Sequence, residues 1–477
     1  MSPTHILIGF AILAAELFTL LRAILRPNRE PAARLAWVIV ILFIPIIGIF
    51  LYFLLGETRL SERRRFRGKT IEDGLPRPPG DREAMKRLGE GRHDAPFALA
   101  RTINRLNPTG GNRAHLAADS DAAIDEMCAD ADAAQATVHG CFYIWLDDSN
   151  GLKVKDSFIR AAQRGVNVRV LADALGSYRL IRSGHWSDLR AAGVDARVAL
   201  PVGSLLMTLV RGRIDLRNHR KSLIVDNRVA WVGSQNAADP AFAIKAAFAP
   251  WVDIMTRWEG PVAQHCQFLF VSDWMSEGGQ DLTALLKAAP PARVGRAIAQ
   301  VIGTGPTLRF DAMPNTFNEL IHSARHELVL TTPYFVPDEQ LLFALTSAAR
   351  RGVRTIMVVP RRIDSRIVAA TCKSYFGDLV EAGVELYRYR PGLLHAKTMI
   401  VDNSIGLIGS ANLDRRSFEL NFENNILFAD EDFARTVRAR QDSYIGESDR
   451  VSMADIQAFT LGDRIWNNFV AMMSPLL

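Results

Sequence analysis

A segment of 18 residues occurs twice in the chain, and this duplication limits the fold more than any other feature. The first copy extends from His219 to Asn236 and the second from His395 to Asn412, and 9 of the 18 aligned positions are identical. Both copies have the order His-x-Lys-x4-Asp, followed by Gly-Ser-x-Asn. A lone His-x-Lys is common by chance, but two copies in register with the same tail indicate that the chain contains one structural unit twice.

Each copy has the pattern of a β-hairpin. Residues 222–225 and 398–400 predict a strand, Asp-Asn predicts the turn, and apolar residues return on the other side. Alternate residues of a strand share a face, so each histidine points the same way as its lysine. A structural hairpin alone does not explain why both copies open with this pair. An imidazole beside a fixed ammonium suits a phosphodiester, because the anionic oxygens need neutralising while phosphorus is attacked.

The candidate catalytic residues are the members of the two motifs. They are His219, Lys221, Asp226, His395, Lys397 and Asp402. The two aspartates follow their histidines by seven residues, and this odd spacing puts them on the opposite face of an extended strand. We therefore expect Asp226 and Asp402 to fix the Asp-Asn turns, and the lysines to hold the non-bridging phosphate oxygens.

Six further polar residues are expected to support the motifs. They are Ser234, Asn236, Ser410 and Asn412 in the tails, and Asp253 and Glu423 on the strands that follow. The asparagines are candidate donors to phosphate, whereas the serines either bond phosphate or shape the turn. A nucleophilic histidine must present one ring nitrogen, so another group should hold the second. We expect the two carboxylates to lie within hydrogen-bond reach of the two histidines.

Neither a cofactor nor a metal is expected. Lysine is not a usual metal ligand, and the motifs lack a cluster of histidine, cysteine and carboxylate at ligand spacing. Two lysines can neutralise the phosphate instead. The four cysteines are scattered without CxxC spacing, which implies neither a disulfide framework nor a zinc site.

The N-terminal region has two apolar stretches and predicts a membrane hairpin over residues 1–58. Leu35–Leu55 holds 21 uncharged, largely apolar residues, enough to cross a bilayer core as a helix, and Ile6–Leu21 is a weaker candidate. A cleaved signal peptide fits less well, because the first stretch lacks a basic start. Arginines and a lysine between residues 59 and 69 outnumber the four arginines between the stretches, which favours a cytoplasmic catalytic part.

Residues 59–96 are basic and rich in proline and glycine, and we interpret them as a linker before two similar domains, 97–290 and 291–477. In both domains helical patterns alternate with buried strands, which predicts an α/β fold with a mixed, mostly parallel sheet flanked by helices. A pseudo-twofold axis would relate the domains and join the motifs in one cleft. The extra apolar run 205–210 could guide acyl chains or be a buried excursion. The end of the chain, Ile456–Leu477, predicts an amphipathic helix that packs on the body or, as the less favoured alternative, faces the membrane.

The paired motifs resemble the signature of the phospholipase D superfamily. Flanking segments resemble the membrane-anchored bacterial cardiolipin synthases, namely RNHRK (217–221), DIMTRWEGP (253–261), TTPYFVPD (331–338), NLDRRS (412–417) and NFE (421–423). The resemblance implies a bilobal fold with one active site between the halves. It also implies transfer of a phosphatidyl group from one phosphatidylglycerol to another, giving cardiolipin and glycerol.

The mechanism expected from these residues has two displacements. One histidine attacks phosphorus and the other protonates the departing glycerol, then deprotonates the incoming hydroxyl. The order common in the superfamily makes His219 the nucleophile and His395 the acid and base, although the near-symmetry leaves the reverse open. The alternatives are another phosphatidyltransferase, a hydrolytic phospholipase D, a membrane-tethered nuclease and a non-catalytic lipid-binding protein.

The expected partners are phosphatidylglycerol and cardiolipin in an anionic bacterial inner membrane, which the protein would enter as a multi-pass protein. The net charge of +6 favours anionic partners in general. Nucleic acid is not expected, because a long basic groove interleaved with aromatic residues is missing from the sequence pattern. The sequence is compatible with a homo-oligomer.

Overall fold

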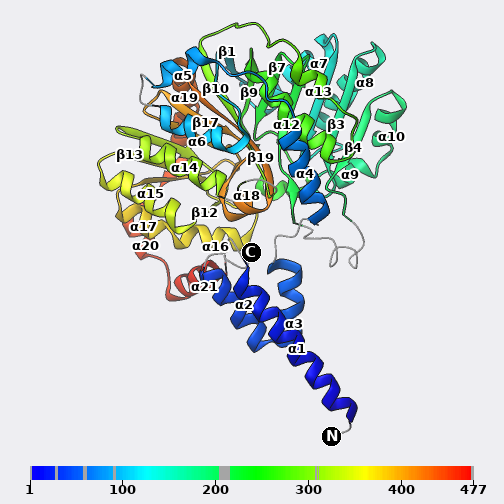
Figure 1. Ribbon diagram of the computed structural model, residues 1–477. Coiled ribbons are helices and arrows are strands. Elements are labelled where there is room, and N and C mark those ends of the chain that lie inside the picture. The colour runs from blue at the N-terminus through cyan, green and yellow to red at the C-terminus, as the bar shows by residue number, and fades with distance from the viewer. Residues whose placement is uncertain are drawn as a thin grey trace.

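The computed structural model describes residues 3–26, 31–56, 62–89, 93–202, 215–306, 309 and 311–473. The apolar run 205–210 and the last four residues therefore lie outside the described ranges. A column of N-terminal helices leads into a large α/β body (Figure 1). These helices are α1 (Pro3–Leu25), α2 (Pro31–Phe43), α3 (Pro45–Leu51) and the π-helix η1 (Tyr52–Gly56).

Helix α1 is long enough to cross a membrane, and it is the one helix in the described ranges that passes a test of length and hydropathy. Its 23 residues span about 34 Å. The segment Leu35–Leu55 does not form the one continuous helix expected, because it breaks at Pro45, which has no N–H to continue α2. Helix α3 then folds back along α2. The rings of Trp37 and Tyr52 are 5.4 Å apart, whereas 15 residues of straight helix would separate them by about 22 Å.

Glycine at position 48 permits this close return. A Cβ atom there would lie 2.5 Å from the carbonyl oxygen of Val40, so a larger residue would push the two helices apart. Helix α2 alone covers about 20 Å, which is short of a 30 Å hydrocarbon core. The described N-terminal region thus consists of one helix long enough to span a membrane and a shorter helix pair that turns back.

The segment 59–96, expected as a linker, is instead largely helical and packed on the body. It contains α4 (Glu62–Gly74), α5 (Arg82–Gly89) and the start of α6 (Asp94–Asn104). Leu75, Ala84 and Leu88 are buried in hydrophobic clusters of the body. The proline- and glycine-rich composition marks the short connections between these helices.

Two halves with the same order of elements follow. The first half comprises β1 (Thr109–Leu116), α7 (Ser120–Ala133), β2 (Thr137–Phe142), α8 (Ser149–Gln163), β3 (Asn167–Asp173), α9 (Tyr178–Ile181), α10 (Gly184–Ala191), β4 (Asp195–Ala199), β5 (Arg217–Asn218), β6 (Lys221–Val225), β7 (Val229–Gly233), η2 (Ala243–Phe248), β8 (Trp251–Val252), β9 (Met255–Glu259), α12 (Val262–Ser276) and α13 (Thr283–Lys287). The strand predicted over 222–225 lies within β6.

The second half repeats the pattern and adds a C-terminal extension. It comprises β10 (Ala297–Thr304), α14 (Ala312–Ser323), β11 (Glu327–Thr331), β12 (Phe335–Val336), α15 (Glu339–Arg350), β13 (Arg354–Pro360), α16 (Arg366–Ser374), α17 (Phe376–Glu381), β14 (Glu385–Tyr389), β15 (Leu393–Leu394), β16 (Thr398–Val401), β17 (Ile405–Gly409), β18 (Leu413–Asp414), α18 (Arg415–Glu419), β19 (Asn421–Ala429), α19 (Glu431–Gly446), β20 (Ser448–Arg450), α20 (Met453–Gln457) and α21 (Leu461–Met472).

One continuous sheet runs through both halves. Its order is β20-β14-β13-β11-β16-β17-β19-β10-β1-β9-β7-β6-β2-β3-β4, so each half contributes a similar block and β10 meets β1 at the junction. Within the described residues, β2-β3-β4 and β11-β13-β14 are parallel, and the other pairs along this order are antiparallel. The expectation of a mostly parallel sheet is therefore wrong. Tight hairpins such as β6-β7 and β16-β17 can join only antiparallel strands.

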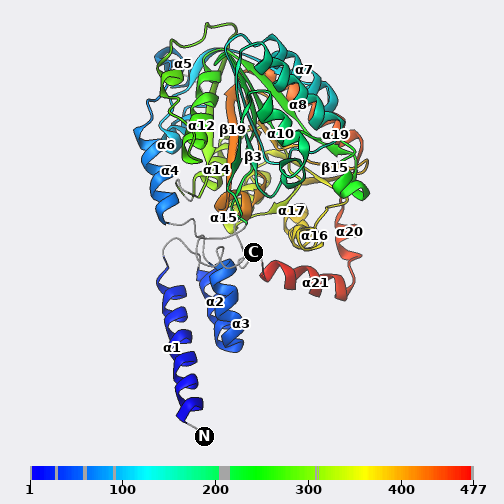
Figure 2. The ribbon, with the colours of Figure 1, turned by 90° about the vertical axis from the view of Figure 1, so that its right-hand side faces the viewer.

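Alternate residues of the strands enter different hydrophobic clusters. In β11, Leu328 packs under α14 and α15, whereas Val329 enters a central cluster that includes Phe268 of α12 and Val437 of α19. This central cluster contains residues of both halves and covers one face of the whole sheet. Figure 2 shows the sheet between these layers of helices. The two halves therefore share one core, which holds their motifs in a fixed relation.

The motif aspartates lie at the turns, away from the histidines. Asp226 and Asn227 have positive φ angles of 51° and 56°, as a tight two-residue hairpin turn requires. The carboxylate of Asp226 accepts 2.8 Å hydrogen bonds from the amides of Gln135, Ala136 and Thr137 at the start of β2.

Asp402 does the same in the second half, with the amides of Arg325, His326 and Glu327. Their grouping with the catalytic residues is corrected accordingly, because backbone amides occupy both carboxylates. The expected part in fixing the turn is present.

Candidate active site

Each motif histidine is held by a strand of the opposite half. The two residues before His219 form β5, which pairs in parallel with Asn421–Phe422 of β19, and the His219 amide donates to the Phe422 carbonyl at 2.9 Å. The two residues before His395 form β15, which pairs in parallel with β8, and the His395 amide donates to the Val252 carbonyl at 2.8 Å. These exchanged pairings bring the two motifs to one site between the halves.

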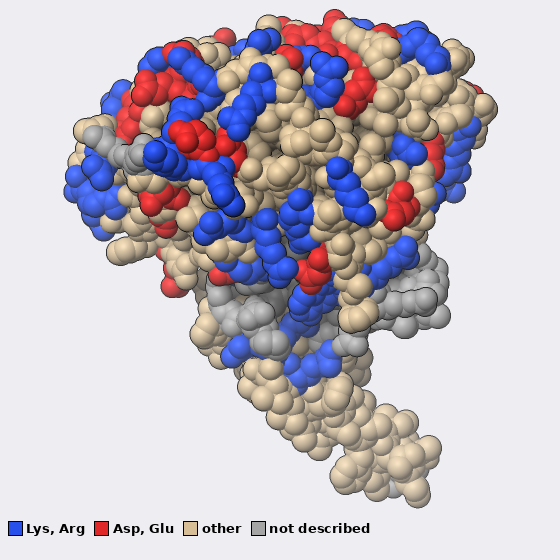
Figure 3. Space-filling model, turned by 45° about the horizontal axis from the view of Figure 1, so that its top comes forward, with Lys and Arg blue, Asp and Glu red and all other residues tan. Residues whose placement is uncertain are grey.

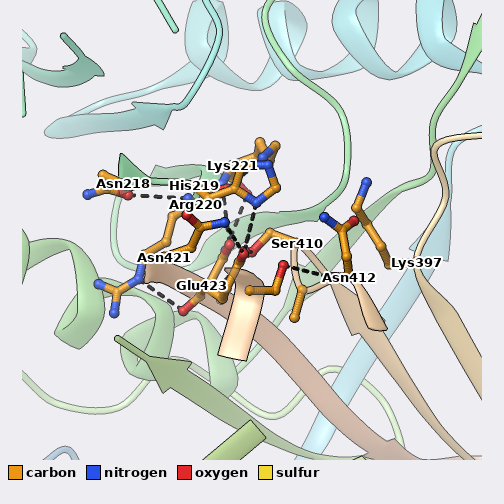
Figure 4. A network of polar contacts seen from close by, with 12 residues as sticks. Asn218, His219, Arg220, Lys221, Lys397, Ser410, Asn412, Asn421 and Glu423 are labelled. Carbon is orange, nitrogen blue, oxygen red and sulfur yellow. Dashed lines mark hydrogen bonds and ion pairs between the residues drawn. The ribbon is translucent and has the colours of Figure 1, made fainter. Parts of the chain in front are cut away.

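The same exchange pairs each histidine with the carboxylate of the other half. His219 Nδ1 lies 2.9 Å and 3.0 Å from the two oxygens of Glu423, and His395 Nδ1 lies 2.6 Å from Asp253 Oδ1. Figure 4 shows the first of these contacts, with Glu423 directed at His219 and Lys397 in the same view. The expected contacts between histidines and carboxylates are present. Each carboxylate leaves Nε2 of its histidine as the ring nitrogen available for chemistry.

The tail serines hold these carboxylates from behind. Ser234 Oγ donates to Asp253 Oδ1 at 2.5 Å, and Ser410 Oγ donates to Glu423. Asn421 Nδ2 adds a second donor to Glu423 at 3.1 Å. Of the two alternatives for the serines, phosphate binding and turn shaping, neither describes these contacts. The hydroxyls position the carboxylates that orient the imidazoles.

The two lysines bend back toward the histidines. Lys221 Nζ donates to the carbonyl oxygen of His219 at 2.6 Å, and Lys397 Nζ donates to that of His395 at 2.5 Å. Lys221 Nζ also lies 5.1 Å from the ring centre of Tyr143. Both lysines are buried, so two ammonium groups are available beside the imidazoles with little competing water.

Burial and this charge cluster set the protonation of the site. Burial lowers the pKa of His219 well below its usual value, and the charges of Lys221, Lys397 and His395 lower it further. Burial and the charge of Lys397 bring the pKa of His395 to about 4 despite the Asp253 carboxylate. Both imidazoles are therefore neutral at pH 7 before substrate arrives.

The two carboxylates differ in their titration. Burial raises the pKa of Glu423 to about 7, against the charge of Lys221 and the Ser410 hydrogen bond. Burial also favours the neutral form of Asp253, but the contact with His395 and the charge of Lys397 outweigh it and leave the pKa lowered. Asp253 is thus the more firmly ionised carboxylate, and the two halves are not chemically identical.

The two tail asparagines, Asn236 and Asn412, have different hydrogen-bond partners. Asn236 Oδ1 accepts from the amide of Ile144 at 3.1 Å, which leaves its amide nitrogen as the group suited to phosphate. Asn412 Nδ2 lies 3.3 Å from Asp414, the N-cap residue of α18. Asn412 Oδ1 is buried without a partner among the described residues.

Four residues near the site were not predicted. Tyr143 and Trp251 place their ring centres 4.8 Å from the imidazoles of His219 and His395, respectively. Arg220 crosses to the second half, where it contacts the Glu423 carbonyl at 3.1 Å, and Asn424 exchanges hydrogen bonds with the backbone of Lys221. Arg220, Trp251 and Asn424 each stand within two residues of a motif histidine or a predicted carboxylate in sequence, whereas Tyr143 has no such neighbour.

The variant Ser410→Ala tests the support behind Glu423. Hydrogen bonds to charged groups contribute about 1.5–3 kcal/mol, so we expect kcat to fall roughly 10- to 100-fold with little change in KM. The matched control is Ser443→Ala, because the Ser443 hydroxyl is exposed and donates only to a carbonyl of its own helix. If both variants had the activity of the parent, Ser410 would not act on the pair formed by Glu423 and His219.

Because the two lysines lose their charge at alkaline pH, we expect kcat/KM to fall there. Burial lowers the pKa of Lys397 to about 7 and that of Lys221 to about 8. Their charge is present below these values and is lost above them, so kcat/KM, which reports the free enzyme, should fall as pH rises through about 7–8. The fall in kcat should occur at higher pH, because bound phosphate stabilises the ammonium form.

The control for this limb is Lys397→Arg, since a guanidinium does not titrate in this range. In this variant, the residual kcat/KM should no longer begin to fall near pH 7. An alkaline limb that is the same in kcat and kcat/KM, and unchanged in Lys397→Arg, would contradict the assignment.

Comparisons with known proteins agree on one family. The family model described as "Cardiolipin synthase, PLD-like domain" matches residues 127–274 and 317–444, and the model "Phospholipase_D-nuclease N-terminal" matches residues 17–57. The chain is 35% identical over 469 residues to "Cardiolipin synthase A" of Erwinia tasmaniensis, covering 96% of this chain and 95% of that protein. The same protein of Serratia proteamaculans is 34% identical with the same coverage.

A solved structure supports the fold. The phosphatidylserine synthase of Haemophilus influenzae superposes with a TM-score of 0.58 at 13% identity and covers 87% of this chain and 100% of its own. Each of the two matched ranges in the body, 127–274 and 317–444, contains one His-x-Lys motif.

Proposed function

The chain belongs to the family of cardiolipin synthases with phospholipase D-like domains, and we propose that it transfers a phosphatidyl group from one phosphatidylglycerol to another, giving cardiolipin and glycerol. The family makes the protein an enzyme of phospholipid synthesis. One observation carries the mechanistic proposal, namely two imidazoles, each hydrogen-bonded through Nδ1 to a buried carboxylate of the opposite half. A paired nucleophile and acid is what a two-step phosphoryl transfer requires.

In the first step, His219 Nε2 attacks phosphorus of the donor and the bond to the glycerol oxygen breaks. His395 gives its proton to that oxygen, so glycerol leaves neutral and the phosphatidyl group stays on His219. The substrate phosphate offsets the charges of Lys221 and Lys397, which removes part of what lowers the pKa of His395, and His395 Nε2 takes up a proton from solvent as the substrate binds. Asp253 stabilises the imidazolium that donates the proton.

In the second step, the terminal hydroxyl of another phosphatidylglycerol gives its proton to His395 and attacks phosphorus. The bond between phosphorus and nitrogen breaks, cardiolipin leaves, and His219 returns to its neutral form. Two in-line displacements give overall retention of configuration at phosphorus. Lys221, Lys397 and the amide groups of Asn236 and Asn412 are the proposed ligands of the non-bridging oxygens.

The proposed setting is an anionic bacterial inner membrane with the catalytic body on the cytoplasmic side. Family membership and the apolar helix α1 make the protein membrane-associated. We keep 97–290 and 291–477 as the proposed domains, with each domain supplying one histidine and the carboxylate for the other. Nucleic acid is not a proposed partner, and a homo-oligomer is compatible with the proposal.

The test uses the purified full-length chain in bilayers of phosphatidylglycerol alone, with products identified by mass spectrometry. Cardiolipin and glycerol should appear in equal amounts. Phosphatidic acid without cardiolipin would instead identify a hydrolytic phospholipase D. Added serine or ethanolamine should leave the product unchanged, and a new head group would identify a different phosphatidyltransferase.

Thorough chelation is expected to leave activity unchanged, because Lys221 and Lys397 supply the positive charge that a metal would otherwise supply. Among the described residues, no group of three or more histidine, cysteine or carboxylate side chains has the arrangement of a metal site. The measurement is the rate of cardiolipin formation after incubation with EDTA and removal of bound ions. A loss that added Mg²⁺ or Ca²⁺ restores would contradict this prediction.

A further inference from the structure

The C-terminal helix α21 lies against the body by a narrow edge. Thr460 and Asp463 form a capping box at its start, and its 12 residues follow in one regular helix. Asn467 and Val470 are its buried residues, and the helix packs on α16. Within the range Ile456–Leu477 that was expected to be one amphipathic helix, the first two residues end α20 and the helix α21 begins at Leu461. Packing on the body uses only a small part of α21.

The rest of α21 presents an apolar stripe. Leu461 and Met472 are each 75% exposed and Ile465 is 60% exposed, with Trp466 and Phe469 more than half exposed. The spacing of four, four and three residues from Leu461 to Met472 places these side chains on one face of the helix. No described residue covers this face. A contiguous exposed apolar face on a helix marks an interaction surface.

The position of α21 indicates what covers the stripe. Figures 1 and 2 place α21 at the end of the body where the N-terminal helices leave it, and the helix runs across the direction of α1. Helix α1 exposes apolar residues such as Leu7 and Phe10 along its length, as a membrane-spanning helix does. The apolar face of α21 thus lies at the end of the body from which the apolar N-terminal helices extend.

The charges around α21 agree with this placement. Arg366 and Lys373 on the neighbouring α16 and Arg464 on α21 are exposed, and the positive charge of Lys373 acts on Asp463 of α21. Figure 3 shows lysine and arginine side chains gathered over the end of the body next to the N-terminal helices. Basic groups beside an apolar helical face suit anionic phospholipid head groups.

We propose that α21 lies in the interface of the same anionic bilayer that α1 enters, as a second attachment of the body. Its apolar stripe enters the boundary between head groups and acyl chains, and the basic residues remain at head-group level. Helix α18, which follows Asn412 of the site, lies at this end of the body (Figure 1). Attachment at α1 and α21 would therefore hold the site close to the head groups of its substrates.

Fluorescence of Trp466 tests the proposal on the full-length chain. The protein is placed in phosphatidylglycerol bilayers whose acyl chains carry bromine near the head group, and the spectrum of Trp466→Phe is subtracted from that of the parent. Trp37 and the other tryptophans cancel in this difference. We expect bromine to quench the Trp466 signal at least 2-fold relative to unbrominated bilayers. An unquenched signal would overturn the proposal, whatever reaction the enzyme catalyses.

A charged variant gives the second measurement. Ile465→Glu combined with Phe469→Glu changes two exposed positions of the stripe, and Thr436→Glu adds a charge at an exposed polar position of another helix, α19. The double variant should abolish quenching of Trp466 and lower turnover of bilayer substrate at least 10-fold, with turnover of dispersed short-chain substrate unchanged. Thr436→Glu should match the parent in quenching and in turnover.

Two other results would count against a membrane contact. Loss of an oligomer in the double variant, with Trp466 unquenched in the parent, would identify a second copy of the chain as the occupant. An equal loss of turnover on bilayer and dispersed substrate would indicate that the stripe acts on the fold or the site. Circular dichroism verifies that the double variant is folded.

Discussion

Replacing His219 with alanine is expected to lower cardiolipin formation by about 10⁴-fold or more, because the residue is the proposed nucleophile and no other group can form the covalent intermediate. Members of a catalytic unit typically cost this much when removed singly. His395→Ala should be comparably inactive with phosphatidylglycerol, since glycerol is a poor leaving group without a proton. The measurement is the initial rate in bilayers, with circular dichroism to verify folding.

A donor with an activated leaving group separates the two histidines. Phosphatidyl-p-nitrophenol releases an anion that needs no proton, so His395→Ala should release about one equivalent of p-nitrophenolate per chain in a burst. His219→Ala should give no burst. The opposite result, with a burst only in His219→Ala, would make His395 the nucleophile and reverse the two roles.

The carboxylates should show the same division, but with the halves exchanged. Glu423 holds His219, so Glu423→Ala is expected to lower the burst rate with the activated donor by about 10²- to 10⁴-fold, as loss of a histidine-orienting carboxylate does in hydrolases. Asp253 holds His395, so Asp253→Ala should lower turnover of phosphatidylglycerol similarly and keep most of the burst. Pre-steady-state release of p-nitrophenolate measures both.

Two variants serve as controls for these carboxylates. Glu423→Gln keeps the size and one acceptor oxygen, and should recover part of the activity lost in Glu423→Ala. Asp449→Asn removes a carboxylate from a surface ion pair with Arg361, and should have the rate of the parent. If Asp253→Ala abolished the burst while Glu423→Ala preserved it, each carboxylate would serve the histidine of its own half, and the exchanged contacts would have no part in the reaction.

The residues of the site could be predicted because strand periodicity is a local property. The spacing of His219 and Lys221 puts both side chains on one face, and the odd spacing of Asp226 removes that carboxylate from it. The structure agrees with both. Which carboxylate meets which histidine could not be predicted, because β5 pairs with β19 across about 200 residues of sequence. Such a pairing depends on how the two halves dock.

Two features of the fold differ from what the sequence predicts: the break in the apolar segment Leu35–Leu55 and the mostly antiparallel sheet. Hydropathy counts the apolar residues between Leu35 and Leu55, but one missing N–H at Pro45 and one missing side chain at Gly48 let the helix fold back. Alternating helices and strands suggest a parallel sheet, yet the short hairpins and the pairing of β10 with β1 and β19 at the junction make most pairs along the sheet antiparallel. Two single residues decide the first feature, and the pairing of strands distant in sequence decides the second.

The most direct test of the mechanism is mass spectrometry of the enzyme during turnover. The His395→Ala variant is mixed with the activated donor or, on a millisecond scale, the parent is mixed with phosphatidylglycerol, and the reaction is stopped in alkaline denaturant, which preserves phosphohistidine. The mechanism predicts a phosphatidyl group on the peptide that contains His219, in His395→Ala with the activated donor at close to one per chain. A fully active parent whose peptides carry no such group under these conditions, or a group that appears on neither His219 nor His395, would contradict it.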